Sequence, residues 1–297
     1  MNRTADILCI GSVLWDMIAR VPGNMRIGAD APGRIVSVPG GVALNIAMTL
    51  ARCGLTPALL SVVGRDPAGD ALIAACEDRG LITDLIYRSD DLPTDQYLAI
   101  EAANGLIAAV ADARSLEFAE DNILNPLVDG TLATQDAPYM GLVALDGNLT
   151  AELMANIATS PVLVGADLRV APASPGKADR LAPFLTHGRG TLYVNLEEAG
   201  ILCQHNFDNS SDAAAAMLEA GARRVLVTDG GNMATEGSPA GLISATPPPV
   251  TVTRVTGAGD TCMATHISAE VRGVPRKDAL TQALEAGALY ASGHTPI

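Results

Sequence analysis

The chain has 297 residues and a net charge of −14, and it is 48 % hydrophobic with only 3 % aromatic residues. This length and apolar content are enough for one large α/β core, built chiefly from Ala, Leu, Val and Ile. The negative charge argues against nucleic acid and anionic membranes as partners, because both require a basic surface. It does not exclude a small anionic ligand, which a few backbone N–H groups can bind locally.

The cysteines and the first residues indicate a reducing environment. The five cysteines are scattered and form no C-x-x-C pair, so neither a disulfide framework nor a zinc site is predicted. The start "MNRTADILCIGSV" is typical of a buried strand rather than a signal peptide, and no apolar run is long enough to span a bilayer. We therefore expect a cytoplasmic protein.

The first third of the chain alternates strands and helices around one interruption. Residues Asp6–Val13 form a short apolar run that predicts a buried strand ending at Gly11. A stretch broken by Pro and Gly follows, with short alternating pieces such as Arg34–Val38. The pattern then predicts a helix, a strand and a second helix, in "GVALNIAMTLARCGL", "PALLSVVG" and "GDALIAACEDRGL".

A hairpin interrupts the middle of the chain before the alternation resumes. "TDQYLAIEAANGLIAAVAD" holds two strand-like runs joined by Asn104-Gly105, a strong hairpin signal. Strands are then expected in "MGLVALDG", "PVLVGADL", "TLYV" and "RRVLVTDGG", with helices between them. This order predicts a mostly parallel sheet covered on both faces, and the two interruptions are expected to form a small second sheet.

The segment "TGAGD" near the C-terminal end predicts a site for phosphate chemistry. Gly257, Ala258 and Gly259 expose backbone N–H groups at the start of a helix, where unpaired donors and a partial positive charge favour an anion. Asp260 directly behind them would repel phosphate, but it suits a general base that takes a proton from an attacking hydroxyl. The alternative is a helix N-cap, a common role for Asp.

Three further clusters are weaker signals. In "VPGGVALNIA", Gly40 and Gly41 allow the backbone to approach a ligand, and the Asn45 amide could bind a polyol hydroxyl; a plain loop-to-helix turn is the alternative. Asp16, after the first strand, is either a carboxylate for diol hydroxyls or a solvated loop acid.

In "NLEEAG", the oxygens of Asn195 and Glu198 suit magnesium held through water, but the same spacing fits an N-cap with Glu at the N3 position. The strand "VTDGG" enters a glycine turn, and in open α/β sheets ligands collect at such carboxyl ends of strands.

Taken in order, these motifs resemble the PfkB (ribokinase-like) family of carbohydrate and nucleoside kinases. The resemblance spans nearly the whole chain, from Asp16 through the Gly-Gly helix start and N-x-x-E to T-G-A-G-D. It implies a three-layer α/β/α core with a mostly parallel sheet, formed by residues 1–11, 39–91 and 113–297. Residues 12–38 and 92–112 would form a β-sheet lid that closes over the acceptor and mediates a homodimer.

The resemblance also implies transfer of a phosphoryl group from ATP, with Mg²⁺, to a small sugar or nucleoside. Asp260 would be the base, and the loop before it the anion hole. The roles carried over to the other positions are acceptor binding for Asp16, Gly40, Gly41 and Asn45, nucleotide binding for Thr228, Gly230 and Thr256, and the magnesium–phosphate group for Asn195 and Glu198.

Several segments are similar to the pseudouridine kinases within this family. They are "GGVALNIAMTLARCG", with Val42 where ribokinases typically carry Lys, the hairpin "PTDQYLAIEAANGLIAAVAD" and "ASPGKADRL". This favours the 5′-hydroxyl of a C-nucleoside as acceptor and puts Thr94 and Gln96 near the substrate. A ribokinase, a fructokinase or a purine nucleoside kinase is the alternative enzyme, and a catalytically silent nucleoside binder is the alternative from another class.

Arg254 departs from the family pattern. Many members carry Asp or Asn at this position, where it supports a monovalent cation site. An arginine there would repel K⁺, and its guanidinium could replace the ion. We therefore expect that the activity of this chain does not require K⁺.

Overall fold

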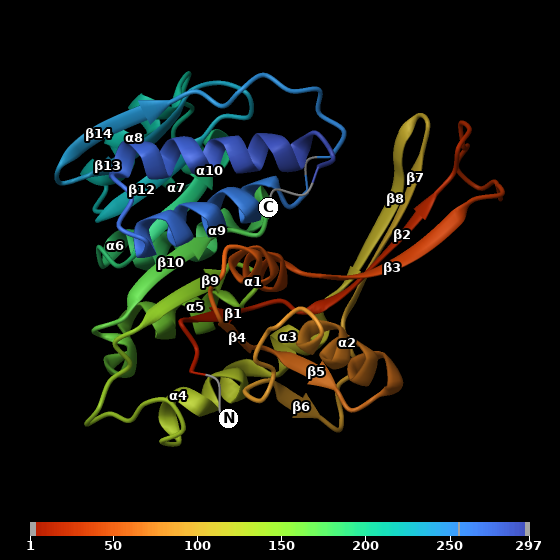
Figure 1. Cartoon of the computed structure of the whole chain (residues 1–297), viewed down its shortest axis with the longest axis horizontal. Coiled ribbons are helices and arrows are strands. Elements are labelled where there is room, and N and C mark those ends of the chain that lie inside the picture. The colour runs from red at the N-terminus through yellow and green to blue at the C-terminus, as the bar shows by residue number, and fades with distance from the viewer. Residues whose placement is uncertain (1–3, 255, 295–297) are drawn as a thin grey trace.

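The computed structural model describes residues 4–254 and 256–294. Its main element is an eight-stranded sheet in the order β14-β13-β12-β11-β10-β9-β1-β4, seen at the left of Figure 1. The pairs from β4 to β12 are parallel, and β13 and β14 add an antiparallel edge. The strands are β1 (Ile7–Ile10), β4 (Pro57–Leu60), β9 (Leu142–Asp146), β10 (Asp167–Ala171), β11 (Thr191–Asn195), β12 (Arg224–Thr228), β13 (Ala234–Ser238) and β14 (Gly241–Ala245).

Helices cover both faces of this sheet (Figure 1). One face is packed against α1 (Val42–Arg52), α9 (Ala258–Val271) and α10 (Arg276–Ala291). The other is packed against α5 (Ala151–Thr159), α6 (Ala182–Thr186), α7 (Leu196–Cys203), α8 (Ser210–Glu219) and the 3₁₀ segment η3 (Pro175–Leu181). The predicted mostly parallel sheet between two helical layers is therefore confirmed.

The core consists of two apolar clusters, one on each side of the sheet. Strand β1 shows the division, because Leu8 and Ile10 belong to one cluster, and Ile7 and Cys9 to the other. Successive side chains of a strand point to opposite faces, so a strand buried on both faces reads as the continuous apolar run seen in the sequence.

A separate four-stranded sheet, which we call the small sheet, extends away from the core and has the order β3-β2-β7-β8 (Figure 1). Its strands are β2 (Leu14–Arg20), β3 (Arg34–Gly40), β7 (Gln96–Ala102) and β8 (Gly105–Asp112). The predicted Asn-Gly hairpin joins β7 to β8, and Gly105 has a φ of 101° that favours glycine. The Asn104 side chain also accepts from the Met25 N–H at 3.0 Å, which ties the hairpin to the loop between β2 and β3.

The remaining elements lie near the base of the small sheet or connect strands of the main sheet. Strands β5 (Val62–Gly64) and β6 (Tyr87–Ser89) pair in parallel as a third, two-stranded sheet. The other helical segments are α2 (Pro67–Glu77), α3 (Arg114–Phe118), η1 (Glu120–Leu124), α4 (Asn125–Val128) and η2 (Pro161–Leu163).

Two predicted strands differ from the structure. "PALLSVVG" is split at Ser61, and its second half joins β6 rather than the main sheet. In "PVLVGADL", the apolar start is the 3₁₀ turn η2, and the strand begins only at Asp167. Val162 and Leu163 are still buried in the core, so the apolar pattern predicted their burial correctly. Pro161 favours a turn over an extended backbone, and the prediction of a strand at this position was therefore wrong.

An ion network buried beneath α9 fixes this helix to the sheet. Glu270 of α9 pairs with Arg169 of β10 and Arg224 of β12. Arg224 also pairs with Glu236 of β13, which accepts from Arg276 of α10 as well. Burial alone would raise the pKa of Glu270, but the Arg224 hydrogen bond and the Arg169 charge hold it at about 2. The carboxylate is therefore ionised throughout the neutral pH range.

Within the described residues, no helix combines the length and the apolar character that crossing a membrane requires.

Candidate active site

The start of α9 forms a cradle of backbone N–H groups. Gly257 is the N-cap, with a φ of 90°, and no side chain among the described residues caps the first turn. A Cβ at Gly259 would meet no atom within 4 Å, so the space beside this residue is open. The first N–H groups of α9 therefore have neither a side-chain nor an intrahelical acceptor, which is the arrangement that attracts an anion.

Asp260 is the third residue of α9 rather than its N-cap, so the N-cap alternative is wrong. Its Oδ2 accepts from the Asn45 Nδ2 of α1 at 3.0 Å. Burial raises the pKa of Asp260 to about 7; the Asn45 hydrogen bond opposes this shift, and the charges of Asp146 and Asp16 add to it. A carboxylate with a pKa near neutrality is well matched to take a proton from a hydroxyl.

Asp16 faces Asp260 from the small sheet. We call Asp16, Asn45 and Asp260 the Asp260 group. It lies on β2, and a Cβ added to Gly40 would come within 2.1 Å of its Oδ2. Burial raises the pKa of Asp16 to about 6, and its carboxylate has no hydrogen-bond donor among the described residues. Such a carboxylate is available to accept from hydroxyl groups of a ligand.

The two glycines at the start of α1 are needed for close backbone contacts. Gly41 is the N-cap of α1, with a φ of 99°, and a Cβ there would lie 2.5 Å from the Ser12 carbonyl oxygen. Gly40 leaves room for the Asp16 carboxylate. Side chains at either position would displace the loop between β1 and β2 or the Asp16 carboxylate.

Asp146, at the end of β9, is a residue that the sequence analysis missed. It is fully buried and accepts from the Ser12 N–H at 2.8 Å, the Ser12 hydroxyl, the Ala43 N–H at 3.2 Å and the Asn148 N–H at 2.8 Å. It therefore joins the ends of β1 and β9 to the start of α1. The signal was an Asp before Gly at the carboxyl end of a predicted strand, where ligands and their supporting residues collect.

Asn195 and Glu198 form the capping box that was the alternative reading. The Glu198 N–H donates to the Asn195 Oδ1 at 2.8 Å, and the Asn195 N–H donates to the Glu198 Oε2 at 2.8 Å. Burial raises the pKa of Glu198 to about 7. Its Oε1 has no hydrogen-bond partner among the described residues, so one oxygen is free to bind a cation.

The side chains around Glu198 suit magnesium only where water and substrate phosphates supply the remaining ligands. No cluster of three or more His, Cys, Asp or Glu side chains in the described parts of the chain could hold a metal ion. Magnesium keeps several waters and is commonly bound by one or two carboxylates together with substrate phosphates. The pair Asn195 and Glu198 fits that mode of binding.

The residues assigned to the nucleotide lie at the same edge of the sheet but make no hydrogen bond to the Asp260 group. Thr228 ends β12 and is in register with Asn195 of β11. Gly230 follows with a φ of 54° and open space around a hypothetical Cβ. Thr256 is exposed in the turn before α9. The carboxyl ends of β9, β11 and β12 thus form one continuous edge.

Thr94 and Gln96 do not join this group. Thr94 is buried, and its hydroxyl and N–H both donate to Asp66, the N-cap of α2. Gln96 is exposed and pairs with Trp15, one residue out of phase with Asp16, so the two side chains lie on opposite faces of the small sheet. The Trp15 indole donates to the Ala68 carbonyl of α2.

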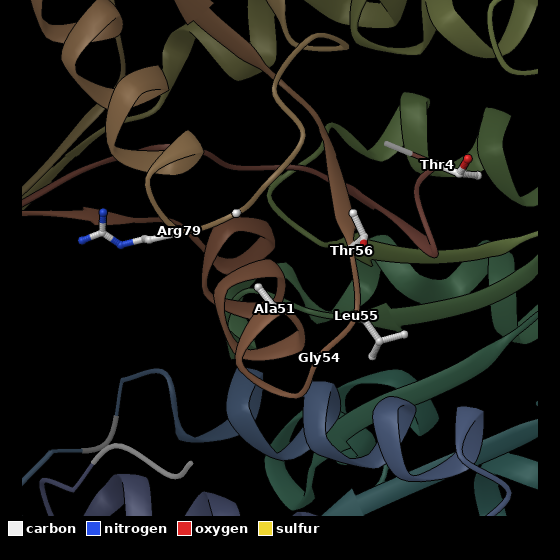
Figure 2. Close-up of a pocket in the computed structure, with 7 residues that line it drawn as sticks. Thr4, Ala51, Gly54, Leu55, Thr56 and Arg79 are labelled. Carbon is white, nitrogen blue, oxygen red and sulfur yellow. The ribbon is translucent and has the colours of Figure 1, made fainter. Parts of the chain in front are cut away.

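Two hollows lie away from the Asp260 group. Figure 2 shows one of about 420 Å³ at the far end of α1, where Arg79 points away from Ala51 and Thr56. The other, of about 660 Å³, lies in the small sheet between Arg20, Arg34 and Glu101. Neither contains a residue of the Asp260 group, and neither is the candidate site.

Two solved kinases share this architecture. A carbohydrate kinase from Agrobacterium tumefaciens superposes with a TM-score of 0.81 at 24 % identity, over 98 % of this chain and 93 % of that one. A ribokinase from Thermotoga maritima superposes with a TM-score of 0.79 at 19 % identity, over 97 % and 93 %. These likenesses confirm the ribokinase-like fold.

Two curated relatives are similar over most of the chain at modest identity. A pseudouridine kinase of Escherichia coli is 29 % identical over 287 residues, which is 93 % of this chain and 87 % of the relative. A pseudouridine kinase of Arabidopsis thaliana is 26 % identical over 254 residues, which is 77 % and 65 %. The model of the pfkB family of carbohydrate kinases matches residues 4–297. The chain therefore belongs to the PfkB family of carbohydrate kinases.

Proposed function

We propose that the chain transfers the γ-phosphoryl group of ATP to the ribose 5′-hydroxyl of a nucleoside, with pseudouridine as the acceptor. The observation that carries the kinase chemistry is Asp260, a carboxylate with a pKa of about 7 behind the open N-terminus of α9 and facing Asp16. The two pseudouridine kinases among the relatives support the choice of acceptor.

The acceptor is held by the group at the start of α1. Asp16 accepts hydrogen bonds from ribose hydroxyls, because its carboxylate has no donor within the described chain. The close contacts at Gly40 and Gly41 let the acceptor lie against the backbone. Asn45 reaches both the acceptor and the Asp260 carboxylate. Fixing the hydroxyl in this way replaces a bimolecular encounter by a positioned one, and positioning is one of the two main sources of rate in phosphoryl transfer.

The phosphoryl transfer requires one proton transfer. Asp260 takes the proton of the 5′-hydroxyl as the oxygen forms a bond to the γ-phosphorus. The bond between that phosphorus and the β–γ bridging oxygen breaks, and ADP leaves with the electron pair. The N–H groups of Ala258 and Gly259 stabilise charge on the transferring oxygens.

The nucleotide lies along the β11–β12 edge in this proposal. Thr228, Gly230 and Thr256 border it, and Asn195 and Glu198 hold magnesium through water and phosphate. Magnesium, when bound, offsets negative charge on the phosphates. Residues 12–38 and 92–112 act as the lid that excludes water from the acceptor.

The acceptor is tested directly by a panel. Purified protein is incubated with ATP–Mg²⁺ and with pseudouridine, uridine, ribose, fructose and a purine nucleoside, and products are identified by mass spectrometry. We expect pseudouridine 5′-phosphate to form fastest, with uridine as the matched comparison because only the base attachment differs. Faster phosphorylation of another member would assign that acceptor, and tight binding without any product would favour the silent binder.

The pKa of Asp260 predicts the acid limb of the rate profile. Because the base must be ionised, kcat/KM should rise with pH and level off above about 7. Asn45→Ala removes a hydrogen bond that favours the ionised form, so the limb should move to higher pH. Asp260→Asn should lower kcat by roughly 10²–10⁴-fold.

Asn156→Ala, on the exposed side of α5, serves as the control, and its profile should match the wild type. An unchanged limb in Asn45→Ala, or near-normal turnover in Asp260→Asn, would reject Asp260 as the base.

Arg254 predicts a rate that does not depend on K⁺. Its Nε donates to the Tyr290 carbonyl at 2.7 Å, its Nη2 donates to the His294 carbonyl at 3.0 Å, and its guanidinium lies 3.6 Å from the Tyr290 ring centroid. A fixed cation thus joins the loop before α9 to the last turn of α10 and to His294 after it. Wild-type rates should agree in KCl, NaCl and tetramethylammonium chloride, and Arg254→Ala should gain activation by K⁺ or guanidinium. Strong K⁺ activation of the wild type would contradict this.

A homodimer through the lid is the proposed assembly. Ile35, Leu98 and Val110 are exposed on the face of the small sheet opposite Asp16. Sedimentation velocity should give a dimer, and Ile35→Asp should shift it to monomer. Ile27→Asp is the control, because Ile27 is 93 % exposed in the loop between β2 and β3. A wild-type monomer, or dissociation by both variants alike, would count against this interface.

A further inference from the structure

Lysine is rare in this chain, and one of the two lysines lies at the edge of the sheet that carries the site. Of the 19 basic residues Lys and Arg, only Lys177 and Lys277 are lysine. Lys277 is exposed on α10, whereas Lys177 is half-buried in η3. Nearly all positively charged side chains of this protein are therefore arginines. A half-buried lysine is the exception, and its surroundings show what its ammonium can bind.

The position of Lys177 relates it to both halves of the site. It follows β10, which lies between β9, the strand of Asp146, and β11, the strand of Asn195. Its Nζ donates to the Asn148 Oδ1 at 2.5 Å. The Asn148 Nδ2 in turn donates to the Ser12 Oγ at 3.1 Å, and this oxygen accepts from the Val42 N–H at the start of α1.

The charge of Lys177 is not neutralised by an ion pair with any carboxylate of the described residues. Burial lowers the pKa of its ammonium, and repulsion from Arg180 adds to this, while Asp146 and Glu117 oppose it. Arg180 itself donates to the carbonyls of Gly147 and Leu149, so its guanidinium is committed to the turn after β9. An ammonium that forms no ion pair among the described residues, and that feels the charge of Asp146, has donors left for a phosphate bound at this edge.

We propose that Lys177 binds the phosphoryl group as it passes from the nucleotide to the acceptor, an inference that rests on the proposed kinase reaction but on no particular acceptor. The ammonium, which already feels the charge of Asp146, offsets negative charge around the transferring oxygens. A compact ammonium, unlike the planar guanidinium of Arg, binds a phosphate oxygen as a point charge on a flexible stem. Lys177 thereby complements the backbone N–H groups of α9 from the carboxyl end of β10, at the same edge of the sheet.

The first test uses the wild-type protein and needs no acceptor. Amines are reductively methylated with and without saturating ATP–Mg²⁺, saturation being established by calorimetry, and labelling of each lysine is read by mass spectrometry. ATP–Mg²⁺ should protect Lys177 several-fold and leave Lys277 unchanged. Equal labelling of Lys177 with and without nucleotide overturns the proposal, whatever the acceptor panel gives.

The second test measures turnover with the acceptor that the panel identifies as best. Lys177→Met should lower kcat by roughly 10²–10³-fold, the usual loss for one donor to a transition-state anion, with little change in acceptor KM. Lys277→Met is the matched control and should behave as wild type, and Lys177→Arg should recover part of the lost rate.

A rise in acceptor KM with kcat intact would overturn the proposal, because it would make Lys177 only a clamp on the Asn148 turn. If Lys177→Met does not fold, the protection experiment on the wild type decides alone.

Discussion

The structure depends on bringing negative charge together in a partly dehydrated place. Asp16 comes from the small sheet, Asp146 from β9 and Asp260 from α9, and the charges of the first two raise the pKa of the third. Burial and like charge both disfavour the ionised carboxylate. Each of these groups is held by a separate rigid element. Burial first, and the two neighbouring charges after it, raise the pKa of Asp260 and supply the basicity that the proposed reaction requires.

Asp146 differs from the other two carboxylates in how its charge is satisfied. It accepts hydrogen bonds from Ser12, Ala43 and Asn148, so its oxygens are occupied by the chain itself. Asp16 has no donor among the described residues, and Asp260 has one, from Asn45. The number of hydrogen-bond donors from the chain therefore distinguishes Asp146, which holds the fold together, from Asp16 and Asp260, which remain available for a ligand.

The buried ion network beneath α9 serves the same site from a distance. Asp260 lies in the first turn of α9 and Glu270 near its end, where Arg169 and Arg224 hold the helix to β10 and β12. Removing one partner of a buried ion pair leaves an uncompensated charge, so the network resists displacement of the helix. A rigid α9 in turn keeps its open N–H groups and Asp260 at fixed positions relative to Asn45 of α1.

The sequence predicted those features that depend on local patterns, and it missed those that depend on long-range contacts. The run at Ile7–Ile10, the Asn104-Gly105 hairpin and the start of α9 are local signals of burial, turn geometry and helix initiation, and they were predicted correctly. The hydrogen bonds of Asp146 to Ser12 span 134 residues, and no spacing rule reports them.

Thr94 is a second example of a long-range contact that the sequence did not predict. The resemblance to pseudouridine kinases implied a place for Thr94 near the substrate, but its hydroxyl donates to Asp66, 28 residues earlier, at the N-cap of α2. Helix capping by Asp is locally encoded, whereas the choice of a hydroxyl from another segment as second donor depends on how the segments pack. A candidate ligand contact can therefore be identified from sequence, but whether the chain already uses that side chain cannot.

Net charge and local charge act on different length scales in this protein. Charges on its surface are screened over about 8–10 Å at physiological ionic strength, so most of the −14 is not felt by a phosphate inside the site. In the proposed site, a phosphate would meet the N-terminus of α9 and the side chains nearest to it. An acidic protein can thus accept a polyanion where a helix N-terminus replaces bulk positive charge. The three carboxylates make that replacement costly, and in the proposed reaction the ammonium of Lys177, which forms no ion pair among the described residues, offsets part of this cost.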